Sequence, residues 1–275
     1  MSRIEGRLSE LRGRGELRGK EPRKALVTFI TAGDPSAAAS VPALHALVRG
    51  GADILELGMP FSDPEAEGPS IQRSSERALA GGITLSQILD MVSDFRSEDP
   101  VTPVVLMGYV NVLERIGYSE FVEQAHSAGV DGLIIVNLPP EEAQPLKRLM
   151  DQRDMNLIFL VAPTTTEARM QLIAEQAGGF VYYVSLKGVT GADHLQADSI
   201  PDRVAALKRH TDHPIMIGFG IKNAAAARSV SRFADGVVVG SVLVDTMAGL
   251  AQDPAAIPAA LQAQLAEFRA ALDSD

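Results

Sequence analysis

Short hydrophobic runs rich in Val, Ile and Leu recur along the whole chain, and we count eight of them. Each run is hydrophobic without a break rather than at alternate positions, which is typical of parallel strands that are buried on both faces. The eight expected strands cover residues 25–31, 52–58, 103–109, 131–137, 156–162, 179–185, 214–220 and 234–240. The pattern therefore predicts a parallel sheet that needs helices to cover it.

Segments with hydrophobic residues three or four positions apart lie between these runs, as expected for amphipathic helices. They include residues 37–51, 86–98, 118–129, 143–154, 167–178 and 200–210. Glycines stand near the ends of several segments, where glycine favours a left-handed C-terminal cap: Gly50, Gly51, Gly129, Gly178 and Gly179. The alternation of strand and helix predicts an α/β fold.

Eight strand and helix units over about 250 residues fit a closed (βα)8 barrel, whereas an open Rossmann-type sheet normally has about six strands. We therefore expect residues 1–275 to form a single (βα)8 TIM barrel domain. Residues 1 to about 20 predict an extra N-terminal helix, with Ile4, Leu8 and Leu11 on one side. This helix is placed to close the bottom of the barrel.

Composition narrows the class of protein. The chain has 275 residues, of which 46% are hydrophobic, so it has enough apolar material for a large core. A net charge of −10 argues against a nucleic-acid partner. The absence of Cys excludes disulfides and thiolate chemistry, and no histidine spacing indicates a metal site. Without a secretory signal or a membrane-spanning run, we expect a cytoplasmic protein with no membrane contact.

Glycines at the ends of the last two expected strands indicate an anion site. The active site of such a barrel lies at the C-terminal ends of its strands, and the last two strands commonly bind phosphate there. Gly218, Gly220 and Gly240 allow backbone N–H groups to approach an anion, and a short helix begins near Ser241. Relief of crowding in a turn explains one such glycine, but the pair of strands favours a phosphorylated small substrate.

Glu56 lies inside the second expected strand, between aliphatic neighbours. Burial there raises the pKa of a carboxyl towards neutrality, which suits a group that both donates and accepts protons. An ion pair with a nearby Lys is the structural alternative. The position at the barrel mouth favours a catalytic role.

The segment ELGMPFSDPEAEGPSIQ, with TAGDP, LKGVTGA, GFGI and VVVGS, closely resembles the α subunit of tryptophan synthase. The resemblance covers nearly the whole chain. It implies a (βα)8 barrel enzyme of tryptophan biosynthesis, a lyase that cleaves indole-3-glycerol phosphate to indole and glyceraldehyde 3-phosphate by a retro-aldol step. It also implies an α2β2 heterotetramer, in which indole passes to a β subunit. No cofactor is expected in this chain, since pyridoxal phosphate belongs to the β subunit.

The resemblance also implies roles for individual residues. Glu56 matches the family's catalytic glutamate, which protonates indole C3 and deprotonates the glycerol hydroxyl. Glu67 stands where the family has a second catalytic carboxylate. The substrate-binding positions that match are Phe29, Tyr182, Thr190, Gly191, Phe219, Gly220, Gly240 and Ser241. A core role is the structural alternative for Phe29 and Tyr182. Asp63 and Pro64 match the family's loop after the second strand, which faces the partner subunit, and a simple Asp-Pro turn is the structural alternative for them.

Three residues depart from the family pattern. Glu67 replaces an Asp, Glu65 replaces a Leu and Asn137 replaces an Asp. Glu67 keeps the charge but lengthens the side chain by one C–C bond, about 1.5 Å. Glu65 raises the pKa of a neighbouring carboxyl if both face inward. Asn137 loses the charge and keeps the capacity for hydrogen bonds.

These departures leave two alternatives to the α-subunit reaction. One is a diverged lyase of specialised metabolism that acts on a related substrate. The other is a weakly active α-like protein that binds and regulates a β subunit. Drift with adjustment of the loop explains the departures equally well.

Overall fold

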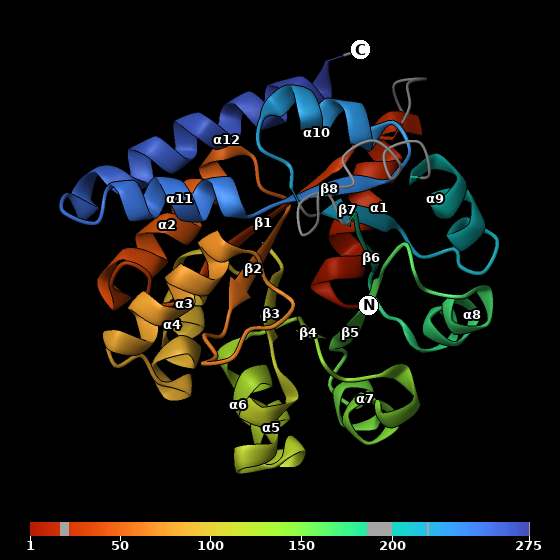
Figure 1. The fold of residues 1–275 in the computed structure, drawn as a ribbon, viewed down its shortest axis with the longest axis horizontal. Coiled ribbons are helices and arrows are strands. Elements are labelled where there is room, and N and C mark those ends of the chain that lie inside the picture. The colour runs from red at the N-terminus through yellow and green to blue at the C-terminus, as the bar shows by residue number, and fades with distance from the viewer. Residues whose placement is uncertain (17–21, 186–199, 219, 275) are drawn as a thin grey trace.

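The computed structural model describes residues 1–16, 22–185, 200–218 and 220–274. Eight parallel strands form a closed barrel in which each strand pairs with the next and β8 pairs with β1. Figure 1 shows the helices arranged around the outside of these strands. The strands are β1 (Ala25–Thr31), β2 (Ile54–Gly58), β3 (Val104–Gly108), β4 (Gly132–Ile135), β5 (Asn156–Val161), β6 (Val181–Val184), β7 (Ile215–Gly218) and β8 (Gly236–Val239).

The predicted (βα)8 barrel is confirmed, and every expected strand contains an observed one. The predicted helices correspond to α2 (Ala37–Gly50), α4 (Leu85–Glu98), α6 (Tyr118–Ala128), α7 (Gln144–Asp151), α8 (Glu167–Gln176), α9 (Ile200–Lys208) and α11 (Ser241–Gly249). The structure adds α3 (Pro69–Ala80), α5 (Val110–Ile116), α10 (Ala224–Ser231), α12 (Ile257–Asp273) and the short 3-10 helices η1 (Pro140–Glu142) and η2 (Pro254–Ala256).

The glycines near helix ends divide into two groups. Gly51 and Gly129 are left-handed caps, with φ of 105° and 92°, as predicted. Gly179 also has a positive φ, of 69°, but it lies two residues beyond Ala177, the C-cap of α8. For Gly50 and Gly178 the prediction was wrong, because neither has a positive φ. Both are needed for close packing instead, since an added Cβ would lie 2.9 Å from Leu265 at Gly50 and 2.9 Å from Asn156 at Gly178.

The N-terminal helix closes the bottom of the barrel, as predicted. Helix α1 (Arg3–Glu16) buries Ile4, Leu8 and Leu11. These three side chains belong to the same hydrophobic cluster as barrel-interior residues such as Val27 and Ile54. The lower half of the barrel is therefore a packed core, which leaves the opposite end for a site.

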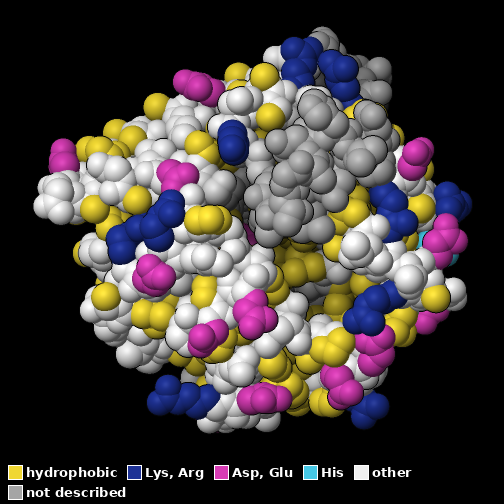
Figure 2. Space-filling model, in the orientation of Figure 1, with side chains coloured by type: hydrophobic (Ala, Val, Ile, Leu, Met, Phe, Trp, Pro, Cys, Tyr) yellow, Lys and Arg dark blue, Asp and Glu magenta, His cyan; other side chains and the backbone are white. Residues whose placement is uncertain are grey.

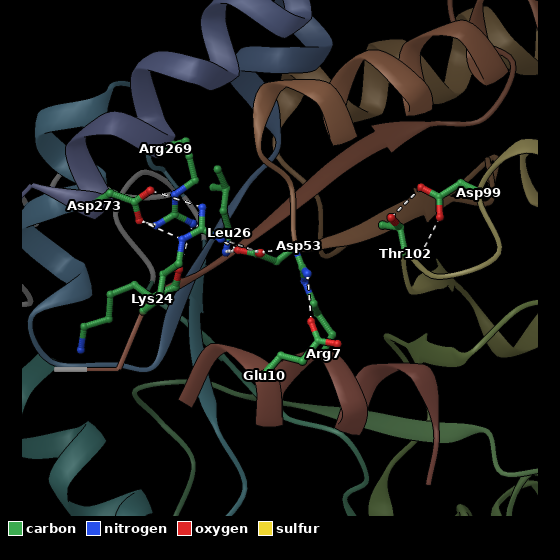
Figure 3. A network of polar contacts seen from close by, with 10 residues as sticks. Arg7, Glu10, Lys24, Leu26, Asp53, Asp99, Thr102, Arg269 and Asp273 are labelled. Atoms are coloured by element: carbon green, nitrogen blue, oxygen red, sulfur yellow. Dashed lines mark hydrogen bonds and ion pairs between the residues drawn. The ribbon is translucent and has the colours of Figure 1, made fainter. Parts of the chain in front are cut away.

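A network of polar contacts fastens α1 and α12 to the bottom of the barrel (Figure 3). Asp53, just before β2, is buried and accepts a hydrogen bond from the backbone N–H of Leu26 at 2.9 Å. Arg7 of α1 and Arg269 of α12 reach the same carboxylate at 2.8 and 3.2 Å. This arrangement satisfies a buried charge with several donors, so we assign the network a structural role.

Candidate active site

Glu56 points into the barrel from the middle of β2. It pairs in register with Phe29 of β1 and with Val105 of β3, and it is 1% exposed. Its Oε2 atom has no hydrogen-bond partner among the described residues. Burial, and after it charge repulsion from Glu67, raises the pKa of Glu56 to about 8. A buried carboxyl that keeps its proton at neutral pH has the property required of a general acid.

The second carboxyl, Glu67, lies on the loop between β2 and α3. Its backbone N–H donates to the carbonyl of Pro64 at 3.2 Å, and its carbonyl accepts from the side chain of Gln72 at 2.8 Å. Burial raises the pKa of the Glu67 carboxyl to about 7, and the nearby Tyr109 hydroxyl limits that rise. Glu67 is therefore close enough to influence Glu56 and is held by its loop.

Helix α3 anchors this loop to the top of β1. Arg77 forms a two-pronged ion pair with the buried Asp34, at 2.7 and 2.8 Å. The hydroxyl of Ser74 contacts that of Thr31. Thr31 and Asp34 lie at the C-terminal end of β1, where we expected catalytic or binding residues, but their side chains hold α3 in place. A two-pronged Arg–carboxylate contact fixes the orientation of both groups, so it also holds the loop that precedes α3.

Glu65 does not share the pocket with Glu67. Its side chain is exposed, so the condition under which it would raise a neighbouring pKa is not met. Burial is the main cause of the raised pKa of Glu67. Asp63, on the same loop, is also exposed.

Asn137 has a defined structural contact. Its side-chain oxygen accepts a hydrogen bond from the backbone N–H of Val110 at 2.8 Å, at the start of α5, and its amide donates to Asn111 at 3.1 Å. The first backbone N–H groups of a helix need an oxygen acceptor, and an amide oxygen serves as well as a carboxylate oxygen. The replacement of Asp by Asn therefore keeps a local hydrogen bond.

Phe29 forms one wall of the barrel mouth. A Cβ added at Gly58 would lie 2.6 Å from the Phe29 ring, and one added at Gly240 would lie 3.2 Å from its Cβ. The glycines on β2 and after β8 therefore make room for this ring. Since Phe29 also pairs with Glu56, the ring is placed beside the carboxyl.

Tyr182 of β6 faces the same interior. Burial and the charge of Glu56 raise its pKa well above the ordinary value, so its hydroxyl stays protonated. A Cβ at Gly218 would collide with the ring and hydroxyl of Tyr182. Gly218 therefore provides space for Tyr182, and its predicted role in anion binding stays a prediction.

Three of the remaining predicted phosphate-binding residues, Gly220, Gly240 and Ser241, follow β7 and β8. Helix α11 begins at Ser241, directly after Gly240, as predicted. The N–H groups of Leu243 and Val244 donate to the carbonyl of Gly240 at 2.8 and 3.1 Å. The positive end of the helix lies here, which suits an anion. Gly220 has a φ of 74°, so the turn after β7 requires a glycine. Thr190, Gly191 and Phe219 lie outside the described residues.

Two contacts of the loop between β2 and α3 were missed in the sequence. Tyr109 follows β3 and accepts a hydrogen bond from this loop, and Gln72 of α3 donates one to it. Tyr109 stands at a strand end, which was the available signal. Gln72 carried no signal, because its contact depends on the path of the loop. In the part of the chain that is described, no group of His, Asp and Glu residues is arranged to hold a metal ion.

The space-filling view shows a hollow in the face of the molecule, bordered by hydrophobic side chains (Figure 2). Among the described residues no helix combines the length and the hydrophobicity needed to cross a membrane.

Comparison with known proteins gives one family. The family described as "Tryptophan synthase alpha chain" matches residues 17–273. The tryptophan synthase alpha chain of Alkalilimnicola ehrlichii is 51% identical over 273 residues, which is 99% of this chain and 97% of that protein. The one from Thioalkalivibrio sulfidiphilus is also 51% identical, over 99% of this chain and 100% of that protein.

Solved structures agree with these relatives. The tryptophan synthase subunit alpha of Legionella pneumophila superimposes with a TM-score of 0.86 at 43% identity, with 99% of each chain covered. A chain of the aminoacrylate-bound tryptophan synthase of M. tuberculosis has a TM-score of 0.85 at 33% identity, with 99% of this chain and 100% of that chain covered. The chain therefore belongs to the tryptophan synthase alpha chain family.

Proposed function

We propose that Glu56 and Glu67 perform the retro-aldol cleavage of indole-3-glycerol phosphate, the lyase reaction of the family to which this chain belongs. The observation that carries the proposal is Glu56 itself. Its carboxyl is buried, its pKa is raised to about 8, and its Oε2 atom has no partner among the described residues. A carboxyl with these properties is ready to exchange a proton with a bound substrate.

The proton transfers on Glu56 balance within one turnover. Protonated Glu56 gives its proton to C3 of the indole ring, which forms an indolenine cation and leaves a carboxylate. That carboxylate takes the proton of the glycerol hydroxyl on the carbon attached to C3. The bond between this carbon and C3 then breaks, its electron pair restores the indole ring, and the aldehyde forms. Glu56 is again protonated, so no additional acid or base is required.

Glu67 supplies negative charge during the same step. Ionised Glu67 accepts a hydrogen bond from the indole N–H and stabilises the positive charge that develops on the ring. Its pKa of about 7 leaves a large fraction ionised at neutral pH. The two carboxyls therefore work in opposite protonation states, with Glu56 protonated and Glu67 ionised.

The other end of the substrate binds at β7 and β8. We assign the phosphate to Gly220, Gly240 and Ser241, with Gly191 from the segment outside the described residues. Phe29, Tyr182 and Phe219 border the indole, and Thr190 stands on the loop after β6. The start of α11 at Ser241 supports the phosphate site, because helix N-termini attract anions.

We also propose that residues 1–275 act as a single barrel domain that assembles with a β subunit as α2β2. The name of the M. tuberculosis structure, a tryptophan synthase, supports such an assembly. In that complex this chain binds no cofactor, and pyridoxal phosphate belongs to the β subunit. The enzyme is assigned to the cytoplasm.

The alternatives raised by the departures from the family pattern are not favoured. A diverged lyase or a regulatory α-like protein is less consistent with 51% identity to tryptophan synthase alpha chains over 99% of this chain. Glu67 also keeps a carboxyl in the site, and Asn137 keeps its hydrogen bond to Val110.

Indole release from indole-3-glycerol phosphate tests the proposal. We expect Glu56→Gln to lower kcat by roughly 10²- to 10⁴-fold, which is the range for loss of a general acid and base. Glu76→Gln, on the exposed face of α3, is the matched control and should leave kcat unchanged. Indole release by the Glu56→Gln variant at the wild-type rate would contradict the assignment.

A further inference from the structure

Gln72 lies in the first turn of α3, and its side chain is half-buried. Its side-chain Nε2 atom donates to the backbone carbonyl of Glu67 at 2.8 Å and, over a longer distance of 3.4 Å, to that of Pro64. A glutamine amide carries two N–H donors, so one nitrogen atom serves both carbonyls. Gln72 therefore ties the loop that carries Glu67 back onto the helix that follows it.

The start of α3 lacks an ordinary cap. Gly68 occupies the N-cap position and has no side chain to accept a hydrogen bond, and Pro69 after it has no backbone N–H. Residues 65–66 of the loop are exposed, so their side chains do not pack into the barrel. The amide of Gln72 thus joins the loop to the helix where a capping side chain is missing.

Helix α3 is a firm base for this contact. Arg77 pairs with the buried Asp34 at 2.7 and 2.8 Å, and the hydroxyl of Ser74 forms a hydrogen bond with that of Thr31. Both partners lie at the end of β1, and β1 pairs in register with β2, the strand of Glu56. A group that is fastened to α3 is therefore also fastened relative to the Glu56 carboxyl.

We propose that Gln72 is a positioning residue, whose amide holds the backbone of Glu67 at the place from which its carboxyl reaches the substrate. The hydrogen bond acts on the carbonyl of Glu67 itself, so it fixes the point at which that side chain leaves the loop. A displacement of about 1 Å in a catalytic group costs on the order of 100-fold in rate, so a modest shift of the loop is sufficient. The inference rests on the proposed role of Glu67.

The first test replaces Gln72 with methionine. Methionine keeps the length of the side chain and a similar helix propensity, and it removes both N–H donors. We expect Gln72→Met to lower kcat for indole release by about tenfold, and to change KM by less than about threefold because the phosphate is assigned to β7 and β8.

Two further variants accompany it. Gln72→Asn keeps the amide but ends about 1.5 Å short of the carbonyls, so it should lose a similar factor in kcat. Gln124→Met is the matched control, since Gln124 is exposed on α6 and its amide donates to Glu120 at 2.6 Å. This control should change neither kcat nor KM.

A Glu67→Gln background separates positioning from a merely structural role. Glutamine at residue 67 keeps the backbone carbonyl that Gln72 binds and removes the carboxylate that the contact is proposed to place. In this background Gln72→Met should lower kcat by a further factor of less than about threefold. A structural role would lower kcat by the same factor in both backgrounds.

A readout without turnover distinguishes this inference from the proposed function. The backbone N–H groups of Glu65, Ala66 and Glu67 all donate hydrogen bonds in the folded protein. Their hydrogen exchange, followed by mass spectrometry, should be faster by about tenfold in Gln72→Met and unchanged in Gln124→Met. Wild-type protein that releases no indole would defeat the proposed function, and the exchange would still decide the Gln72 contact. Unchanged exchange, or an equal loss of kcat in the wild-type and Glu67→Gln backgrounds, would overturn the inference.

Discussion

Replacing Glu56 with glutamine should make the protein more resistant to unfolding at alkaline pH. In the unfolded chain this carboxyl has an ordinary pKa of 4.5, whereas burial raises it to about 8 in the folded protein. Between these two values the unfolded state releases its proton and the folded state keeps it. Raising the pH therefore favours the unfolded state, and stability present below 4.5 is lost as the pH rises through 8.

The size of the effect follows from the two pKa values. The higher pKa of Glu56 in the folded state lowers the free energy of unfolding of the wild type by about 1 kcal/mol at pH 5 and by about 5 kcal/mol at pH 9. Both values are relative to a side chain that does not titrate. The free energy of unfolding of Glu56→Gln, minus that of the wild type, should thus increase by about 4 kcal/mol over this range. The buried amide adds a constant offset, so the change with pH is the quantity to compare.

Urea unfolding followed by circular dichroism between pH 5 and 9 measures this difference. Glu76→Gln is the control for removing an exposed carboxylate, and its difference from the wild type should stay within about 0.5 kcal/mol. A difference for Glu56→Gln that stays flat from pH 5 to 9 would show that Glu56 ionises in the folded protein as it does in water. The reasoning about its catalytic proton would then fail.

Three further predictions follow. The plot of kcat/KM against pH should be bell-shaped, because activity rises as Glu67 ionises near pH 7 and falls as Glu56 loses its proton near pH 8. A flat profile from pH 6 to 9 would refute both assignments. Gly218→Ala should displace Tyr182, which should destabilise the protein by about 1–3 kcal/mol in urea unfolding and raise KM. An unchanged KM would show that Tyr182 does not contact the substrate. Leu8→Ala should cost about 2–5 kcal/mol in urea unfolding with kcat unchanged, and a smaller loss would show that α1 is only loosely packed.

The barrel could be predicted because its physical signal is strong and local. Buried parallel strands need unbroken apolar runs, and β1 was expected at its observed bounds. The apolar side of α1 likewise required a partner, and the open bottom of the barrel was the available surface. The ends of helices were harder to predict, since Gly50 and Gly178 serve packing contacts with Leu265 and Asn156 that are distant in the chain.

In the candidate site, too, some residues could be predicted and others could not. Glu56 could be predicted because burying a carboxylate inside an apolar strand costs free energy, which indicates a functional reason for it. The packing role of Gly218 could not be found, since its neighbour Tyr182 comes from another strand and the contact depends on side-chain direction. The exposure of Glu65 and the hydrogen bond from the Ala66 backbone to Tyr109 depend on the path of the loop, which no periodic pattern encodes.

Indole release from indole-3-glycerol phosphate, measured with and without a tryptophan synthase β subunit, tests the central claim most directly. The purified chain should release indole slowly alone and faster with the β subunit, and Glu56→Gln should abolish most of the release in both conditions. Absence of detectable indole from the wild-type chain in both conditions would contradict the account.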